Sequence, residues 1–388
     1  MDAGSKKLNV VFSTDCIKYP LTGIGRYAFE LAKEIQQREE KIELTYLHGT
    51  RVADSLAVAS ESGQSVQSLK RKLQKSKAVS EMYRLTFPLM KSLVLKKFKH
   101  HIFHSPNYYL PPRVPHCVAT FHDLSVFHWP QFHPAGRVHL MQKELRNTVS
   151  RASVLITDSY YTKRELCEFF GIIPDNIVVA PLACNKDFHP RSSAEVEFTL
   201  NKYNLKPRQF FLYTGTIEPR KNILTLLNAY DRLPVVVKKS FPLVISGYKG
   251  WENEELFRLF TKGEREGWLK YLGFVPGQDL PFLYSAATSF IFPSIYEGFG
   301  LPVLEAMASG TPVICSNATS LPEVVGEAAL MHDPEDVIKL TSYIQMMIDD
   351  AEQKQLMIEK GLVQAKRFSW SVCADKTIEA YEQVAKFI

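Results

Sequence analysis

Residues 293–310 read PSIYEGFGLPVLEAMASG and follow a short apolar run that ends at Phe292. The apolar run predicts a buried strand, and the glycines predict a tight loop after it. Pro302 favours the first turn of a helix, where its missing N–H would be unpaired in any case. A strand, a glycine-rich loop and a helix in this order are typical of α/β sheets that bind nucleotides at the carboxyl ends of their strands. This stretch therefore predicts an α/β fold.

The loop within this stretch carries the groups of a candidate ligand site. The backbone amides of Phe299, Gly300 and Leu301 are expected to point out of the helix N-terminus, an arrangement suited to a diphosphate. Glu297 precedes the helix and Glu305 lies about one turn inside it, so both side chains can face the same opening. Carboxylates accept hydrogen bonds from hydroxyls, so the pair can hold a hexose and a ribose. An ordinary strand-to-helix turn with two solvated glutamates is the alternative interpretation.

The same alternation of apolar and helical segments occurs twice along the 388-residue chain, on either side of a polar stretch at 190–206. The first unit has strand candidates at 8–13, 42–47, 101–104, 117–121 and 154–157, and helices at 27–37 and 161–170. The second unit has strand candidates at 209–213, 243–246, 289–292 and 312–316, and helices at 223–233 and 302–308. Because strands that alternate with helices form parallel sheets, we predict two Rossmann-like, doubly wound parallel-sheet domains that face each other across a cleft. Their predicted bounds are 1–190 and 191–369, and a C-terminal helix at 370–388 is expected to cross back onto the first domain.

A basic pair lies in the segment GTIEPRKN at 215–222, again after a predicted strand and before a predicted helix. When a bond between a sugar and a nucleoside diphosphate breaks, the departing diphosphate gains negative charge. Fixed cations near that oxygen lower the barrier through preorganised electrostatics, and Arg220 and Lys221 are the candidates. A basic helix start without a ligand is the alternative, but cations disfavour a helix N-terminus unless an anion is near.

Two further candidates follow strands of the first predicted domain. The segment TGIGR at 22–26 is predicted to be a loop in which Gly23 and Gly25 let the backbone approach a phosphate or sugar closely. A plain tight turn is an equally good interpretation. His122 can hydrogen-bond a sugar hydroxyl, and Asp123 can hold its imidazole or position an acceptor hydroxyl. A structural histidine is the alternative.

No metal centre is predicted from the spacing of possible ligands. The six cysteines include no short-spaced pair, and the sequence has no D-x-D motif at a predicted strand end. His128, His133 and His139 do not have the compact spacing of zinc ligands. Cations and a helix dipole would then take the place of a metal ion beside the diphosphate. We therefore expect neither a metal nor a cofactor.

Charge and hydropathy set further limits. The chain has a formal net charge of +6 and 45% hydrophobic residues, and no run is long enough to span a bilayer, so we expect a cytoplasmic protein. Basic residues are concentrated at 68–101, where Leu, Met, Phe and Val are interleaved with them. Such a segment can lie on an anionic membrane, and a solvated helix pair that packs on the core is an equally good interpretation. No nucleic-acid-binding module accompanies the segment, so nucleic acid is not expected as a partner.

The string at 293–310 resembles the E-x7-E motif of retaining glycosyltransferases with the GT-B fold, in particular glycosyltransferase family 4. The resemblance implies that Glu297 contacts the donor sugar, Glu305 the nucleotide ribose, and residues 299–301 the phosphate and hexose. It extends over nearly the whole chain and is densest in the second half. A second string that resembles this family, SLPEVVG at 320–326, contains Glu323, which is expected to be structural.

The basic pair and the first-domain segments also resemble positions of this family. Lys221 keeps the family position, whereas Thr216 stands where an arginine often follows the glycine, so Arg220 is expected to replace that guanidinium. The string TGIGRYAFEL at 22–31 resembles the segment of bacterial mannosyltransferases that positions the donor phosphate and the acceptor. His122 stands at a strand end where many members carry a histidine.

The resemblance implies an activity, which we take forward as an expectation. The sequence is similar to bacterial mannosyltransferases that build O-antigen from GDP-mannose. This similarity implies retaining, metal-independent α-mannosyl transfer. The implied acceptor is a glycan on a polyprenyl diphosphate at the inner face of the inner membrane, and the basic segment would then bind that surface. A donor that is a GDP-deoxyhexose or a UDP-sugar is an alternative, as are a sugar-nucleotide epimerase of the same fold and a non-catalytic nucleotide-sugar sensor.

Overall fold

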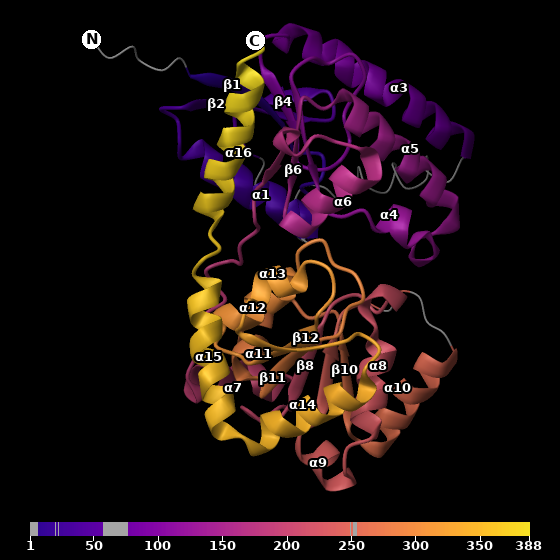
Figure 1. The fold of residues 1–388 in the computed structure, drawn as a ribbon, viewed down its shortest axis with the longest axis vertical. Coiled ribbons are helices and arrows are strands. Elements are labelled where there is room, and N and C mark those ends of the chain that lie inside the picture. The colour runs from indigo at the N-terminus through magenta and orange to yellow at the C-terminus, as the bar shows by residue number, and fades with distance from the viewer. Residues whose placement is uncertain (1–6, 20, 22, 57–76, 249, 251–253) are drawn as a thin grey trace.

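The computed structural model describes residues 7–19, 21, 23–56, 77–248, 250 and 254–388, with the backbone alone at 77–85. Two α/β domains are stacked along the long axis of the molecule (Figure 1). The chain crosses from the N-terminal to the C-terminal domain once and returns at its end, where α16 (Trp370–Ala385) lies along the N-terminal domain. The predicted class of two doubly wound parallel-sheet domains is confirmed.

The N-terminal domain has a seven-stranded sheet of order β3-β2-β1-β4-β5-β6-β7. The strands are β1 (Leu8–Ser13), β2 (Ile42–His48), β3 (Arg51–Ala53), β4 (Ile102–Ser105), β5 (Cys117–Phe121), β6 (Val154–Thr157) and β7 (Ile177–Val179). The helices are α1 (Gly23–Gln36), α3 (Lys77–Leu95), α4 (Ser125–His128), α5 (Ala135–Arg151) and α6 (Tyr160–Phe170), with 3₁₀ turns η1 (Lys96–Phe98), η2 (Pro130–Phe132) and η3 (Pro174–Asn176). Only the edge strand β3 is antiparallel among the described strands. Strand β5 is buried at every position because helices cover both faces of the sheet.

The C-terminal domain has a six-stranded, parallel sheet of order β10-β9-β8-β11-β12-β13. The strands are β8 (Phe211–Thr214), β9 (Leu243–Ser246), β10 (Leu269–Gly273), β11 (Ser289–Phe292), β12 (Val313–Ser316) and β13 (Ala329–His332). The helices are α7 (Ser193–Lys202), α8 (Ile223–Asp231), α9 (Val235–Ser240), α10 (Glu254–Glu266), α11 (Leu280–Ala286), α12 (Leu301–Ala308), α13 (Leu321–Val325), α14 (Val337–Asp349) and α15 (Ala351–Ala365), with the 3₁₀ turn η4 (Pro219–Lys221) before α8.

Each sheet reverses its strand order beside the first strand of its domain, between β1 and β4 and between β8 and β11. Ligands of open α/β sheets bind outside the carboxyl ends of the strands at such points. Ser13 and Ser105 end β1 and β4, Thr216 follows β8, and all three line one cavity. The two reversal points therefore face each other across the interdomain cleft.

The last helix ties the end of the chain to the N-terminal domain. Its residues Trp370, Cys373, Thr377, Tyr381 and Val384 recur at helical spacing and are buried against that domain. The Tyr381 hydroxyl lies 2.7 Å from Nδ1 of the buried His104 on β4. The domain boundary predicted at residue 190 lies between β7 and α7.

The basic segment at 68–101 is described only in part, because residues 68–76 and the side chains to 85 lie outside the described part. Its described part, from residue 77 on, consists of helix α3 followed by η1. Helix α3 does not bury its whole apolar side: Leu89, Met90 and Leu93 are 50%, 52% and 59% exposed. None of the described helices is long and apolar enough to cross a bilayer.

Candidate active site

The loop between β11 and α12 has the geometry expected from its glycines and proline. Helix α12 begins at Leu301, and Gly300 before it has a φ of 103°, which favours glycine. A Cβ on Gly298 would lie 1.7 Å from the carbonyl oxygen of His122, at the end of β5. The missing side chain lets this loop contact the N-terminal domain directly, so the structure brings Gly298 and His122 together at the cleft.

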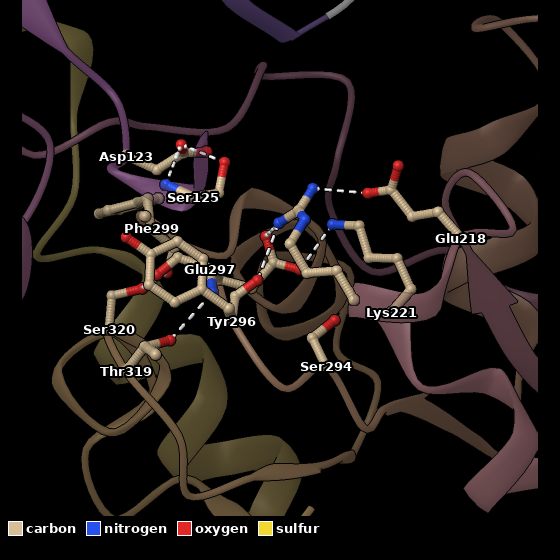
Figure 2. Close-up of polar contacts among 12 residues, drawn as sticks. Asp123, Ser125, Glu218, Lys221, Ser294, Tyr296, Glu297, Phe299, Thr319 and Ser320 are labelled. Atoms are coloured by element: carbon tan, nitrogen blue, oxygen red, sulfur yellow. Dashed lines mark hydrogen bonds and ion pairs between the residues drawn. The ribbon is translucent and has the colours of Figure 1, made fainter. Parts of the chain in front are cut away.

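Two cations from η4 converge on the carboxylate of Glu297 (Figure 2). The Lys221 ammonium lies 2.5 Å from Oε1 of Glu297, and Arg220 Nη1 lies 3.1 Å from Oε2. Arg220 also donates to the Tyr296 carbonyl oxygen at 2.8 Å, and its Nη2 lies 2.7 Å from Glu218 Oε1. The segments at 215–222 and 293–310, predicted to share one site, are therefore in direct contact.

The charged side chains of this cluster are largely buried and compensate one another. Burial would raise the pKa of Glu297, but the charges of Lys221 and Arg220 outweigh burial and hold this pKa below its usual value. Burial lowers the pKa of Lys221 despite the nearby Glu297 carboxylate. The pKa of Arg220 is raised, because Glu297 and Glu218 outweigh the effect of burial. The described site thus holds two cations, Arg220 and Lys221, and two carboxylates, Glu218 and Glu297, whose formal charges cancel. An anionic ligand would add negative charge to this site.

Two hydroxyls fix the backbone around Glu297, and sequence reasoning missed both. The Glu297 amide donates to Thr319 Oγ1 at 3.0 Å, and the Ser320 hydroxyl lies 2.9 Å from the Glu297 carbonyl oxygen and 3.0 Å from that of Phe299 (Figure 2). Thr319 has a φ of 54°, a left-handed conformation that costs a β-branched residue on the order of 1–3 kcal/mol. The strained threonine therefore helps to hold Glu297 in place.

His122 is held by a different carboxylate from the one predicted. Its Nδ1 lies 2.6 Å from Oδ2 of Asp158, and its Nε2 lies 3.1 Å from the Pro106 carbonyl oxygen. Asp123 instead accepts hydrogen bonds from the amide and hydroxyl of Ser125. Of its two predicted roles, holding the imidazole was therefore wrong, and positioning an acceptor hydroxyl stays a prediction. Burial would lower the pKa of His122, but Asp158 outweighs burial and raises it. A sugar hydroxyl would have to compete with Pro106 for Nε2.

Gly23 and Gly25 lie in the first turn of α1, so the loop predicted at 22–26 and the helix start predicted at residue 27 were wrong. The first turn of a helix has no intrahelical partners for its amides, and glycine costs less there than in a helix interior. A Cβ on Gly25 would lie 2.8 Å from the Cys16 carbonyl oxygen, so glycine lets the turn pack on the end of β1. Both glycines line the cleft.

That part of the cleft is a cavity of about 870 Å³. Besides the two glycines, Asp15, Lys91 and Glu144 of the N-terminal domain and Thr216 of the C-terminal domain line it. The Lys91 ammonium is buried, lies 2.6 Å from Asp15 Oδ2 and donates to Ser13 at 2.9 Å. The cavity is large enough for a sugar unit and has hydroxyl-binding carboxylates in its wall.

Glu305 lies inside α12, where the positive charge of Arg26 on α1 acts on it. Burial raises the pKa of Glu305 to about 7, against the opposing influence of Arg26. Glu323, expected to be structural, accepts the amides of Tyr160 and Tyr161 at 2.8 and 3.1 Å and so caps α6 of the other domain. Within the described residues, no three His, Cys, Asp or Glu side chains gather as a metal site would require.

Comparison with known proteins identifies the family of this chain. Residues 21–188 match the family model "Glycosyltransferase Family 4", and residues 196–363 match "Glycosyl transferases group 1". The chain is 45% identical over 379 residues to O-antigen chain mannosyltransferase B of Escherichia coli, with 97% of this chain and 100% of that protein covered.

Solved structures show the same fold. A sucrose-phosphate synthase from Thermosynechococcus elongatus superposes with a TM-score of 0.74 at 20% identity, over 98% of this chain and 100% of that chain. Anabaena HepE in complex with UDP and glucose superposes with a TM-score of 0.69 at 17% identity, over 95% and 98%. The motif at 293–310, the two facing sheets and the full-length relative lead to one conclusion: this chain is a GT-B glycosyltransferase and belongs to glycosyltransferase family 4.

Proposed function

We propose that this protein is a retaining, metal-independent α-mannosyltransferase that moves mannose from GDP-mannose to a growing O-antigen polysaccharide. The full-length, 45% identical relative named O-antigen chain mannosyltransferase B supports the choice of sugar and acceptor. The observation that carries the proposal is the convergence of Lys221 and Arg220 on Glu297 at the mouth of the α12 loop. The two cations can stabilise the negative charge that develops on a departing nucleoside diphosphate.

The donor diphosphate binds in front of the amides at 299–301, where helix α12 begins. Its oxygens replace part of the Glu297 carboxylate as the partner of Lys221 and Arg220. As the bond from the sugar C1 to the phosphate oxygen breaks, these cations stabilise the charge that develops on that oxygen. The freed Glu297 carboxylate accepts hydroxyls of the mannose, and Glu305 accepts those of the ribose.

The acceptor attacks from the face that the diphosphate leaves, so the anomeric configuration is retained. The acceptor oxygen forms a bond to C1, and its proton passes to the departing phosphate oxygen. The freed Glu297 carboxylate is engaged by the mannose hydroxyls, and this route needs no covalent nucleophile. His122, held by Asp158, lies against the backbone of Gly298 and faces the mannose from the N-terminal domain.

The acceptor occupies the cavity of about 870 Å³, which both domains line. Phe87 and Pro88 of α3 form part of its wall, and the exposed Leu89, Met90 and Leu93 follow directly on the same helix. The exposed residues Lys96, Lys97 and Lys99 come next. Apolar side chains beside lysines suit an anionic membrane surface, so we propose that α3 rests on the membrane that holds a polyprenyl diphosphate-linked acceptor.

The activity is tested by incubating the protein with a panel of nucleotide-sugars and a lipid-linked acceptor, followed by linkage analysis of the product. The proposal predicts mannose transfer from GDP-mannose with an α linkage and without added metal. Transfer only from another donor, a β linkage, or an altered nucleotide-sugar released without acceptor would each contradict it. The last of these outcomes would indicate an epimerase.

Flotation with anionic liposomes tests the membrane surface. Leu89→Ser combined with Leu93→Ser should reduce the fraction of protein bound to liposomes, because these two side chains are 50% and 59% exposed. The matched control is Val235→Ser with Val236→Ser on α9, which are 61% and 76% exposed at the far end of the C-terminal domain (Figure 1). Equal binding by the α3 variant and the α9 control would contradict this part of the proposal.

A further inference from the structure

A second cavity, of about 550 Å³, lies between the domains and shares no lining residue with the first. The N-terminal domain contributes residues of α6 and the end of α4, and the C-terminal domain contributes residues that follow β11 and β12. Four aromatic rings and two carboxylates dominate its wall: Trp129, Tyr161, Phe169, Tyr296, Glu165 and Glu168. Neither the donor site nor the acceptor cavity described above uses this space.

The aromatic wall is held in place by its own packing. The Trp129 ring stacks on Phe132 with centroids 5.3 Å apart and planes 2° apart. The Phe169 ring lies edge-on to His128 at 5.5 Å, and the guanidinium of Arg146 lies 5.7 Å from its centroid. Rigid rings lose little entropy when a ligand packs on them, so this wall is preorganised.

The polar part of the wall selects against phosphate. Glu165 is buried and accepts the Tyr296 hydroxyl at 2.5 Å, and its other oxygen lies 3.3 Å from Nε2 of His128. Glu168 is exposed at the rim. Among the described residues that line this cavity there is no lysine or arginine. Its carboxylates, in contrast, can accept hydrogen bonds from hydroxyls. Aromatic faces with hydroxyl acceptors suit a neutral, hydroxyl-rich ligand, and the volume falls in the usual range of ligand pockets, about 300–1,000 Å³.

The floor of this cavity is connected to the reaction centre. Thr319 lines the cavity and accepts the Glu297 amide at 3.0 Å. Tyr296 also lines it, precedes Glu297 and accepts the Leu124 amide at 3.0 Å. A ligand in the cavity would therefore contact the same loop that carries Glu297.

We propose that this cavity binds a neutral hexose unit of the acceptor glycan, away from the hydroxyl that is extended. The choice of a glycan rests on the proposed function, because a polysaccharide chain longer than one unit must continue beyond the first cavity. Occupancy of the second cavity anchors that chain and steadies Tyr296 and Thr319 beside Glu297. Long acceptors then bind more tightly than short ones.

Binding of an α-linked mannotriose to the full chain without donor tests the site and does not depend on catalysis. Isothermal titration calorimetry of the wild type should detect binding, and Trp129→Ala and Glu168→Gln should each weaken it about tenfold. The matched controls are Phe198→Ala, an aromatic that is 86% exposed on α7, and Glu352→Gln, an exposed carboxylate on α15; both should bind as the wild type does. No trisaccharide binding by the wild type, or equal binding by all variants, would overturn the proposal.

Kinetics with acceptors of different length give a second readout. Glu168→Gln should raise KM for a long acceptor about tenfold and leave kcat and the KM for a short acceptor unchanged. A uniform loss with both acceptors would indicate structural damage and would overturn the assigned role. If neither the wild type nor any variant transfers mannose but the cavity variants still bind the trisaccharide more weakly than the wild type, the proposed function is wrong. The proposed binding site is then retained.

Discussion

The ammonium of Lys221 lies 2.5 Å from Oε1 of Glu297, and the two side chains are only 12% and 9% exposed. The cation assigned to the leaving group is therefore paired with the carboxylate assigned to the donor sugar. Each neutralises the other in a largely buried site. In the proposed mechanism, the diphosphate of the donor replaces Glu297 as the partner of Lys221, so donor binding and the release of Glu297 would be coupled.

Loss of the Lys221–Glu297 ion pair should lower the free energy of unfolding as well as the activity. Lys221→Met leaves Glu297 with Arg220 alone, and we expect a loss of about 3 kcal/mol in the free energy of unfolding, the lower end for a broken buried ion pair. The double variant with Glu297→Leu should regain part of that loss because no unpaired charge remains. Urea titration measures both. Lys239→Met, at an exposed lysine on α9, is the control and should unfold as the wild type does. A Lys221→Met midpoint equal to the control's would show that the pair contributes nothing to folding.

Gly298 packs directly against the N-terminal domain at the site. Gly298→Ala places a Cβ 1.7 Å from the His122 carbonyl oxygen, so one backbone must shift and the alignment of His122 with the α12 loop is lost. We expect transfer to fall by a factor of ~10² or more, since misplacement of about 1 Å has effects of this size. Gly136→Ala on α5, where a Cβ would meet nothing within 4 Å, is the matched control. Equal rates for the two alanine variants would contradict the contact.

If Glu305 accepts the ribose hydroxyls, as proposed, donor affinity should depend on pH. Burial raises the pKa of Glu305 to about 7, so this carboxyl is protonated below that pH in the free protein. A ribose hydroxyl that donates to the ionised form binds less well there, so the affinity for GDP-mannose should fall by up to about tenfold per pH unit below 7. The diphosphate of GDP-mannose stays ionised over this range, so it adds no slope. Calorimetry across pH measures the effect, and Glu305→Gln should bind weakly with no such slope. An identical slope in Glu305→Gln would refute the assignment.

Thr319 acts on Glu297 through the backbone. Thr319→Val keeps the shape of the side chain but removes the acceptor of the Glu297 amide, so kcat should fall about tenfold for the loss of one hydrogen bond in the site. Thr319→Ser keeps the hydroxyl and should restore most of the rate. Steady-state kinetics with GDP-mannose distinguish them, and equal kcat values would show that the hydroxyl does not position Glu297.

The parts of the site that were predictable from sequence are those encoded by local patterns. The strand, loop and helix around 293–310, and the basic pair before α8, depend on residues close in the chain, so their types and spacing define the geometry. Strand β11 was predicted at its observed bounds, 289–292. The helix start at Gly23 was not predicted because glycines favour loops, although the first turn of a helix tolerates them.

Contacts between distant segments could not be predicted in the same way. Asp158 lies 36 residues from His122, and Thr319 lies 22 residues from Glu297, so no local pattern connects them. The second cavity is made by segments of both domains and exists only once they pack together. Such pairings depend on how the two sheets are placed, which the alternation of strands and helices does not specify.

Single-turnover transfer of mannose from saturating GDP-mannose tests the central claim most directly, at a temperature where every variant is folded. If Lys221 and Glu297 hold the sugar diphosphate as it breaks, Lys221→Ala and Glu297→Ala should each slow the transfer step by a factor of ~10² or more. Lys239→Ala should transfer at the wild-type rate. Near wild-type rates in both site variants would contradict the account.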